Sequence, residues 1–259
     1  MKNLLKFLGI ITIAVIIGIS LSACEEDDGN SLPSAGDGSL GLTLEKVYDV
    51  TGAEGVTTSN FWLEIGKYYY DEEYEEINNK WLFFPINGNQ EWDSYDSGKW
   101  LDKGFTHPIP GSQIKLENGK LTLKLGTPTQ DFMDHYANDY SLDHWTYGEH
   151  SADHSKLSAT DGLKTISFLQ LEDNDNWGDL RWGKPYPIIM LVYANKDGNV
   201  SGSSTTIDYG NEPLNWKYNW NLKKGWNTVI VTAKAEKNVP VLTLITGKPD
   251  ASIKWVYED

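Results

Sequence analysis

The sequence predicts an all-β domain built as an antiparallel β-sandwich. Short segments alternate apolar and polar residues, which is the pattern of half-buried strands, and turn residues recur about every 8 to 15 positions. The regular alternation of helix and strand that doubly wound and TIM-barrel folds require is missing from the pattern. These observations favour two packed sheets.

The composition supports a folded domain and excludes some function classes. Of the 259 residues, 39% are hydrophobic and 12% are aromatic, which is enough for a large core. The formal net charge is −15, from 37 Asp and Glu against 22 Lys and Arg. We therefore predict no nucleic-acid partner, because phosphate contacts need a basic surface. A single cysteine excludes a disulfide framework.

The N-terminus has the three parts of a secretory signal peptide, predicted over residues 1–23. Lys2 and Lys6 come first, an apolar run of 15 residues follows at positions 7–21, and Ser22-Ala23-Cys24 ends the segment. The run is shorter than the roughly 18 residues of a membrane-spanning helix. Leu21-Ser22-Ala23-Cys24 resembles the lipobox of bacterial lipoproteins. That resemblance implies cleavage before Cys24, lipid on its sulfur and a mature protein tethered to a membrane.

An acidic cluster, Glu25-Glu26-Asp27-Asp28, follows the cysteine directly. It resembles the signal that exports lipoproteins of Bacteroidota to the cell surface, and the alternative is a solvated acidic linker. Residues 24–41 continue with Gly, Ser and Pro and are predicted to be a lipidated flexible linker. The expected location is the bacterial outer membrane, facing outward.

Strands are expected throughout the predicted domain, residues 42–259. The strongest signal is residues 113–125, which alternate on both sides of Asn118-Gly119 as a hairpin does. The apolar run 187–193 predicts a strand buried on both faces, paired through Asp197-Gly198 with 199–207. A third hairpin is expected between 214–222 and 227–234.

The remaining expected strands are residues 42–50, 60–70, 80–86, 239–246 and 251–257. Helix is expected only at 71–78 and within 130–163. The pattern leaves open whether the region before Gly111 belongs to the same sandwich or forms a module of its own, with a split near residue 110. From Gly119 through the turn at 222–227 to Trp255, the sequence resembles uncharacterised bacterial lipoproteins. That family has no assigned activity.

Histidine is concentrated in one segment. Four of the five histidines lie between His135 and His154, and each follows an acidic residue. Imidazole and carboxylate are zinc ligands, so the segment is a candidate divalent-metal site, with Asp143 or Asp153 as a possible fourth ligand. The alternative is a set of solvated acid–histidine pairs, because no standard zinc motif is present. The predicted metal ligands are His144, His150 and His154.

A calcium loop is a weaker candidate. Asp173-Asn174-Asp175-Asn176-Trp177-Gly178 begins like one, but Trp177 stands at the fifth position and Lys184 at the twelfth, where a Glu belongs. Zinc and calcium therefore remain the possible cofactors, and a plain acidic turn is the alternative for this loop.

Aromatic residues are in excess, with 11 Trp and 14 Tyr. Trp216, Tyr218 and Trp220 alternate, so they share one face of a strand, either as core or as an open platform for sugar rings. Other tryptophans lie among Asp, Asn and Gly in segments expected to be loops, where core packing explains them less well. The predicted ligand-binding residues are Trp145, Trp177, Trp182, Trp216 and Trp220.

These features predict a binding protein. No nucleophile elbow or phosphate-binding loop occurs, so catalysis, for example by a glycosidase, ranks last. The leading hypothesis is a surface-exposed, non-catalytic module that binds a glycan or another ligand. The alternatives are a metal-binding lipoprotein and a structural or adhesive surface protein with a protein partner.

Overall fold

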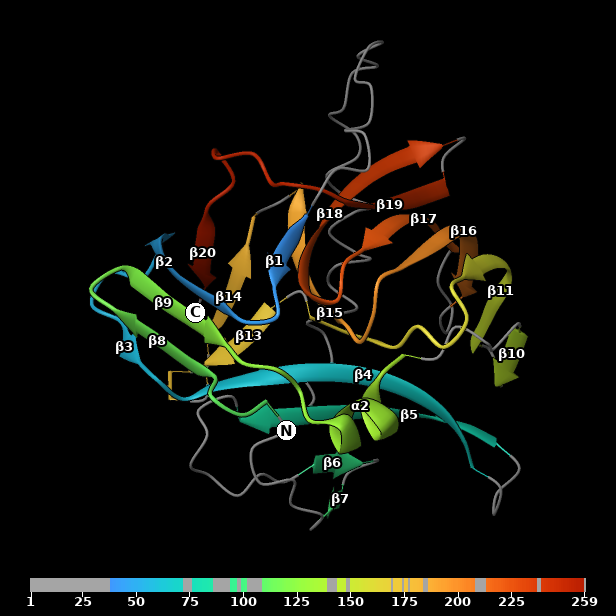
Figure 1. The fold of residues 1–259 in the computed structure, drawn as a ribbon, viewed down its shortest axis with the longest axis horizontal. Helices are drawn as coiled ribbons and strands as arrows, with labels where there is room; N and C mark the ends of the chain where they lie inside the picture. The colour runs from blue at the N-terminus through green and yellow to red at the C-terminus, as the bar shows by residue number, and fades with distance from the viewer. Residues whose placement is uncertain are drawn as a thin grey trace.

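The computed structural model describes residues 38–258 with gaps at 72–75, 86–93, 97–98, 102–108, 139–143, 148–149, 169, 174, 177, 184–185, 208–212 and 237–238. Within these residues the fold is nearly all β, which confirms the predicted class (Figure 1). The strands form two strongly curved sheets, of nine and eleven strands in the described part of the chain. The predicted signal peptide, Cys24 and the acidic cluster lie outside it.

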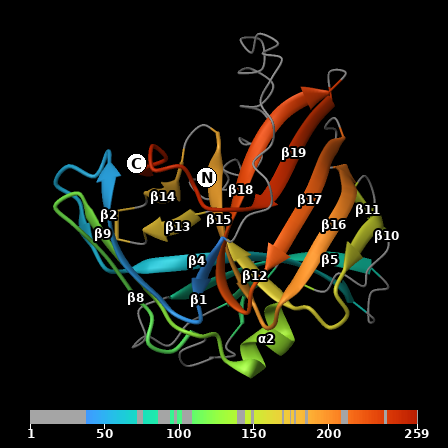
Figure 2. The same ribbon diagram turned by 45° about the horizontal axis from the view of Figure 1, so that its top comes forward.

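The first sheet curves as a fan on one side of the molecule (Figure 2). Its strand order is β10 (His144–Tyr147), β11 (His150–Ala159), β16 (Gly198–Ile207), β17 (Leu214–Leu222), β19 (Val239–Thr246), β18 (Gly225–Glu236), β15 (Ile188–Ala194) and β12 (Thr165–Phe168), with β1 (Ser39–Gly41) paired to β18.

The second sheet passes beneath the first through the long strands β4 and β5 (Figure 1). Its order is β3 (Thr57–Thr58), β8 (Gln113–Glu117), β9 (Lys120–Leu125), β2 (Leu44–Thr51), β20 (Trp255–Glu258), β14 (Asp179–Trp182), β13 (Gln170–Asp173), β4 (Phe61–Asp71), β5 (Glu76–Pro85), β6 (Ser94–Asp96) and β7 (Lys99–Leu101).

Both sheets are mixed, so the strictly antiparallel arrangement is not what the structure has. Strand β19 lies between β17 and β18, antiparallel to β18 and parallel to β17. Strand β20 likewise runs parallel to β2. The expected hairpin between 214–222 and 227–234 is therefore wrong. Both strands exist, but the later strand β19 pairs with both and separates them.

The expected pairing of 187–193 with 199–207 is also wrong. Strand β15 pairs with β12 and β18, whereas β16 pairs with β11 and β17. The burial prediction for this segment is confirmed, because all seven residues of β15 are buried. Alternate residues of β15 pack into the two hydrophobic clusters on opposite faces of the first sheet.

The hairpin around Asn118-Gly119 is confirmed. Strands β8 and β9 pair from Glu117↔Lys120 to Gln113↔Lys124. Asn118 and Gly119 have φ values of 51° and 70°, the left-handed conformation that a tight two-residue hairpin turn requires. Local sequence and tertiary structure agree here.

The helix expectations are mostly wrong. Helix α2 (Gln130–Tyr136) exists and is capped by the Thr129 side chain, but β10 and β11 occupy much of the rest of 130–163. At 71–78, β4 ends at Asp71 and β5 begins at Glu76, and these two residues pair. Ten cross-strand pairs outweigh the local preference of that charged segment.

The end of the predicted linker is part of the fold. Residues 39–41 form β1 on β18, and the Thr228 backbone N–H donates to Gly38 O at 2.9 Å. Gly38 is required by this contact, since a Cβ there would lie 2.6 Å from Thr228 O.

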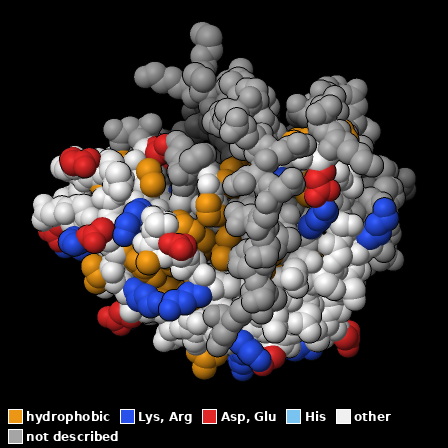
Figure 3. Space-filling view, turned by 90° about the horizontal axis from the view of Figure 1, so that it is seen from above, with side chains coloured by type: hydrophobic (Ala, Val, Ile, Leu, Met, Phe, Trp, Pro, Cys, Tyr) orange, Lys and Arg blue, Asp and Glu red, His pale blue; other side chains and the backbone are white. Residues whose placement is uncertain are grey.

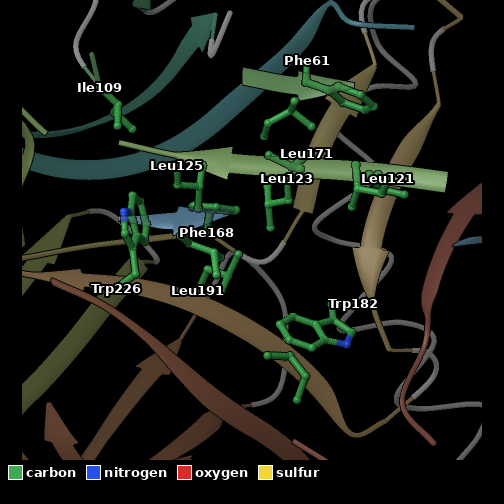
Figure 4. Close-up of a cluster of buried hydrophobic side chains, with 14 of the residues drawn as sticks. Phe61, Ile109, Leu121, Leu123, Leu125, Phe168, Leu171, Trp182, Leu191 and Trp226 are labelled. Carbon is green, nitrogen blue, oxygen red and sulfur yellow. The ribbon is translucent and has the colours of Figure 1, made fainter. Parts of the chain in front are cut away.

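The main core lies between the two sheets (Figure 4). Leu121, Leu123 and Leu125 of β9 face Leu191 and other residues of the first sheet across it. Strands from before Gly111 and from after it contribute to the same cluster and the same sheet. The region before residue 110 therefore shares the core of the later region. A second hydrophobic cluster covers the other face of the first sheet.

Candidate ligand-binding groove

A groove of about 600 Å³ opens at one end of the main core. It is lined by parts of β1 and β2, by Trp182 at the end of β14, by Thr228 of β18, and by residues 248–255 leading into β20. Residues of both sheets line it. The volume lies within the roughly 300–1,000 Å³ typical of small-ligand sites.

Three aromatic rings form the floor of the groove; we call them the groove cluster: Tyr48, Trp182 and Trp255. The strands β2, β20 and β14 are neighbours, and Trp182 pairs with Trp255 in register. Trp255 also pairs with Val50, two residues from Tyr48, so all three rings share one face. The two indoles stack with centroids 5.4 Å apart and planes 16° apart.

Two polar atoms of this cluster are buried without a hydrogen-bond partner. They are the Tyr48 hydroxyl and Trp255 Nε1, whereas Trp182 Nε1 donates to Ile253 O at 3.3 Å. A buried donor without a partner costs about 1–3 kcal/mol. Burial also raises the pKa of Tyr48 to about 12, so its hydroxyl remains a donor at neutral pH. The groove cluster thus holds two unsatisfied donors.

Charged side chains surround this floor. Lys46, Lys248 and Lys254 line the groove, are exposed, and form no ion pair among the described residues. Asp49 and Asp250 also line it, but both carboxylates are engaged. Figure 3, seen from above, shows hydrophobic side chains flanked by separate positive and negative ones on this face.

The two aspartates keep their charge. A hydrogen bond and ion pair from Lys120 lower the pKa of Asp49, with a smaller contribution from Lys254. The Ser252 backbone N–H donates to the Asp250 carboxylate at 2.7 Å and lowers its pKa. The lysines are therefore the uncommitted charges of the groove.

Among the predicted ligand-binding residues, Trp182 is the one placed in this groove. It ends strand β14 and is 7% exposed, so the expectation that it lies in a loop is wrong. Trp145 belongs to β10, with its side chain outside the described part, and Trp177 lies outside the described residues.

Trp216 and Trp220 face the second hydrophobic cluster. Trp220 is 4% exposed, and its ring lies 5.5 Å from that of Tyr218. Trp216 is partly buried and donates from Nε1 to Thr206 Oγ1 at 3.0 Å. The alternating aromatic residues of this strand therefore form core and not an open platform for sugar rings. Neither tryptophan lines the groove.

The predicted metal ligands lie on one hairpin. His144 begins β10, and His150 and His154 belong to β11, with His144 paired to Asp153 and His150 to Tyr147. His144 is therefore not paired with either of the other two histidines. Their side chains lie outside the described part of the structure. Among described residues no group of three His, Cys, Asp or Glu could hold a metal ion.

At the calcium-like loop, Asp175 links two parts of the second sheet. Its carboxylate accepts hydrogen bonds from Thr58 Oγ1 at 3.1 Å and from Asn60 Nδ2 at 3.0 Å. The Asp175 carboxylate therefore connects β3 and the start of β4 to the turn before β14, which explains an acidic residue at this position.

Most residues of the groove were not predicted from the sequence. Tyr48 and Trp255 were not predicted as ligand-binding, and nothing in the sequence pairs β2 with β20, since about two hundred residues separate them. The alternation in 42–50 was the one local signal, because it places Tyr48 on the same face as Leu44 and Val50.

Comparison with known proteins finds no matching family model, no matching curated protein and no matching solved structure. No helix among the described residues is long and apolar enough to cross a membrane.

Proposed function

We propose that this protein is a lipid-anchored, non-catalytic module that binds a glycan or similar ligand in the groove beside the groove cluster. Cys24 would hold it in the bacterial outer membrane, facing outward. The observation that carries the proposal is a groove of about 600 Å³ whose aromatic floor contains two buried donors without partners.

The floor of the groove is incomplete in its hydrogen bonding. Nearly all buried polar groups in folded proteins have hydrogen-bond partners, so an unsatisfied one at a cavity indicates a missing water or ligand. A ligand that combines an apolar face with acceptor oxygens would contact the rings that line the groove, and it would accept from Tyr48 and Trp255 once the side chains above these buried donors shift. Saccharides have this combination of surfaces.

The test measures thermal unfolding and tryptophan fluorescence of the full chain with a panel of polysaccharides. A ligand that binds only the folded state, at about 100 times its dissociation constant, adds about 2.7 kcal/mol and raises the unfolding midpoint. We expect at least one polysaccharide to raise the midpoint and to change the emission of the two groove indoles.

Two exposed apolar residues supply matched variants. Val47 lines the groove and is 65% exposed, whereas Leu42 is 52% exposed and does not line it. We expect Val47→Asp to abolish the shift and Leu42→Asp to preserve it. Equal loss in both variants, or no shift with any polysaccharide, would contradict the proposal.

The same assay tests the metal-binding alternative. A midpoint shift with zinc that disappears when His144, His150 and His154 are changed to alanine would support that alternative. It would also count against the groove as the main functional site if polysaccharides gave no shift. A chain that responds to neither class of ligand would favour the structural or adhesive role.

A further inference from the structure

We propose that the ligand of this groove is an acidic saccharide, whose carboxylate or sulfate meets Lys46, Lys248 and Lys254 while its ring covers the groove cluster. This inference rests on the proposed function and specifies its ligand class. It follows from the contrast between the charge of the groove and that of the chain.

The chain carries 37 acidic against 22 basic side chains, so a random surface site would have an excess of acid. The groove has the reverse balance, with three lysines and two aspartates among its lining residues. Both aspartates are occupied, Asp49 by Lys120 and Asp250 by the Ser252 backbone. None of the three lysines forms an ion pair within the described residues.

An anionic group in the groove would pair with its lysines. Lysine ammonium groups form charge-assisted hydrogen bonds with carboxylate or sulfate oxygens. The Tyr48 hydroxyl and Trp255 Nε1 lie beneath the groove surface, so the same oxygens reach them only when the lining side chains shift. Repulsion from the acidic remainder of the protein is screened beyond about 8 Å at physiological salt, so the local lysines decide the interaction.

A membrane surface is the competing occupant, because the chain enters the domain at the groove. Gly38, Ser39 and Leu40 line it, and Gly38 is 14 residues from Cys24. A flexible linker of that length spans about 20 Å on average. Insertion into a membrane interface, however, needs protruding apolar side chains. Among the described lining residues Val47 is the only exposed large apolar side chain, and the indoles of Trp182 and Trp255 are recessed at 7% and 3% exposure, which favours a small ligand.

The experiment compares charged and neutral forms of the same polymers by fluorescence titration of the full chain. The probes are polygalacturonate against its methyl ester, and dextran sulfate against dextran. We expect the charged form of at least one pair to bind at least tenfold more tightly, and raising the salt to about 0.5 M to remove most of that difference.

The lysine variant is Lys46→Gln, Lys248→Gln and Lys254→Gln in one chain. The control changes three exposed lysines that do not line the groove, Lys156, Lys224 and Lys234, to Gln, so the total charge is the same. We expect the groove variant to lose at least tenfold in affinity for the charged polymer and the control to lose less than twofold.

Four outcomes would overturn the inference. Equal binding of charged and neutral forms, or equal loss in both lysine variants, would remove the acidic ligand but leave the groove as a saccharide site. Binding of no saccharide would overturn the proposed function as well. Binding to phosphatidylglycerol vesicles that needs the groove lysines, without binding to either charged polymer, would assign the groove to the membrane.

Discussion

The main core contains two clusters of three aromatic rings that have similar packing distances but different hydrogen bonding. One is the groove cluster at the open end. The other, which we call the closed cluster, lies deep between the sheets and consists of Phe168, Tyr193 and Trp226. Neighbouring rings are 5.1 to 5.9 Å apart in both, so packing distance does not distinguish them.

Polar partners do distinguish them. In the closed cluster, Trp226 Nε1 donates to Gly126 O at 2.8 Å, and burial raises the pKa of Tyr193, which its interaction with the Thr127 side chain partly offsets. In the groove cluster, the Tyr48 hydroxyl and Trp255 Nε1 have no partner. Of these two clusters, the groove cluster is the one that holds buried aromatic donors without a hydrogen-bond partner, although its Trp182 Nε1 has one.

The largest predicted effect is on the closed cluster. Trp226→Phe leaves a cavity and an unpaired buried Gly126 carbonyl, so we expect a loss of about 3–4 kcal/mol in the free energy of unfolding. Trp255→Phe also loses volume but leaves no hydrogen-bond partner unpaired. We expect it to lower the free energy of unfolding by about 1–2 kcal/mol. Urea unfolding of both variants measures the difference. Similar losses in the two variants would show that the hydrogen-bond contrast carries no energy.

A smaller effect with opposite signs is predicted for the two tyrosines. Tyr193→Phe removes a hydroxyl that interacts with the Thr127 side chain and should lower the free energy of unfolding by about 1 kcal/mol. Tyr48→Phe removes a buried hydroxyl that has no partner and should raise it by about 1 kcal/mol, or about 2–4 °C in the midpoint.

Ligand binding provides the second measurement on this pair. We expect Tyr48→Phe to weaken binding of the saccharide that shifts the wild type, and Tyr193→Phe to leave it unchanged. Tyr48→Phe would then be more stable than the wild type and would bind the saccharide more weakly. A destabilised Tyr48→Phe variant would mean that its hydroxyl already has a partner in solution, such as water, and that the groove floor is complete without a ligand.

The sequence predicts local elements of this fold better than their pairing. The turn at Asn118-Gly119 and the doubly buried β15 follow from neighbouring residues, and both are confirmed. The insertion of β19 between β17 and β18 depends on contacts between segments that compete for the same apolar faces. Local alternation is equally compatible with a hairpin, so the parallel pair could not be predicted.

The candidate site shows the same division. Trp182 was selected because it lies among polar residues, but its actual position is the end of a buried strand. Its stacking on Trp255 arises from cross-strand register over more than seventy residues of sequence. The unsatisfied donors depend on what is absent around an atom. No pattern along the chain reports such an absence.

The smallest predicted effect is a fall in the stability of the folded chain at alkaline pH. Burial raises the pKa of Tyr48 from 10.0 to about 12. Below pH 10 the hydroxyl is protonated in both the folded and the unfolded chain, so it contributes no pH dependence. Between pH 10 and about 12 the unfolded chain loses this proton while the folded chain keeps it, and stability falls as the pH rises.

Tyr48→Phe removes this contribution, so its stability advantage over the wild type should widen from pH 9 to pH 11 in guanidinium unfolding. Bound saccharide should extend the effect in the wild type to higher pH, because an acceptor at the hydroxyl favours its protonated form and raises the pKa of Tyr48 further above that of the unfolded chain. A constant difference between the two chains across this range would mean that Tyr48 titrates near pH 10 in the folded protein. Its hydroxyl would then be exposed to water, and the groove floor would lack the buried donor that distinguishes it from the closed cluster.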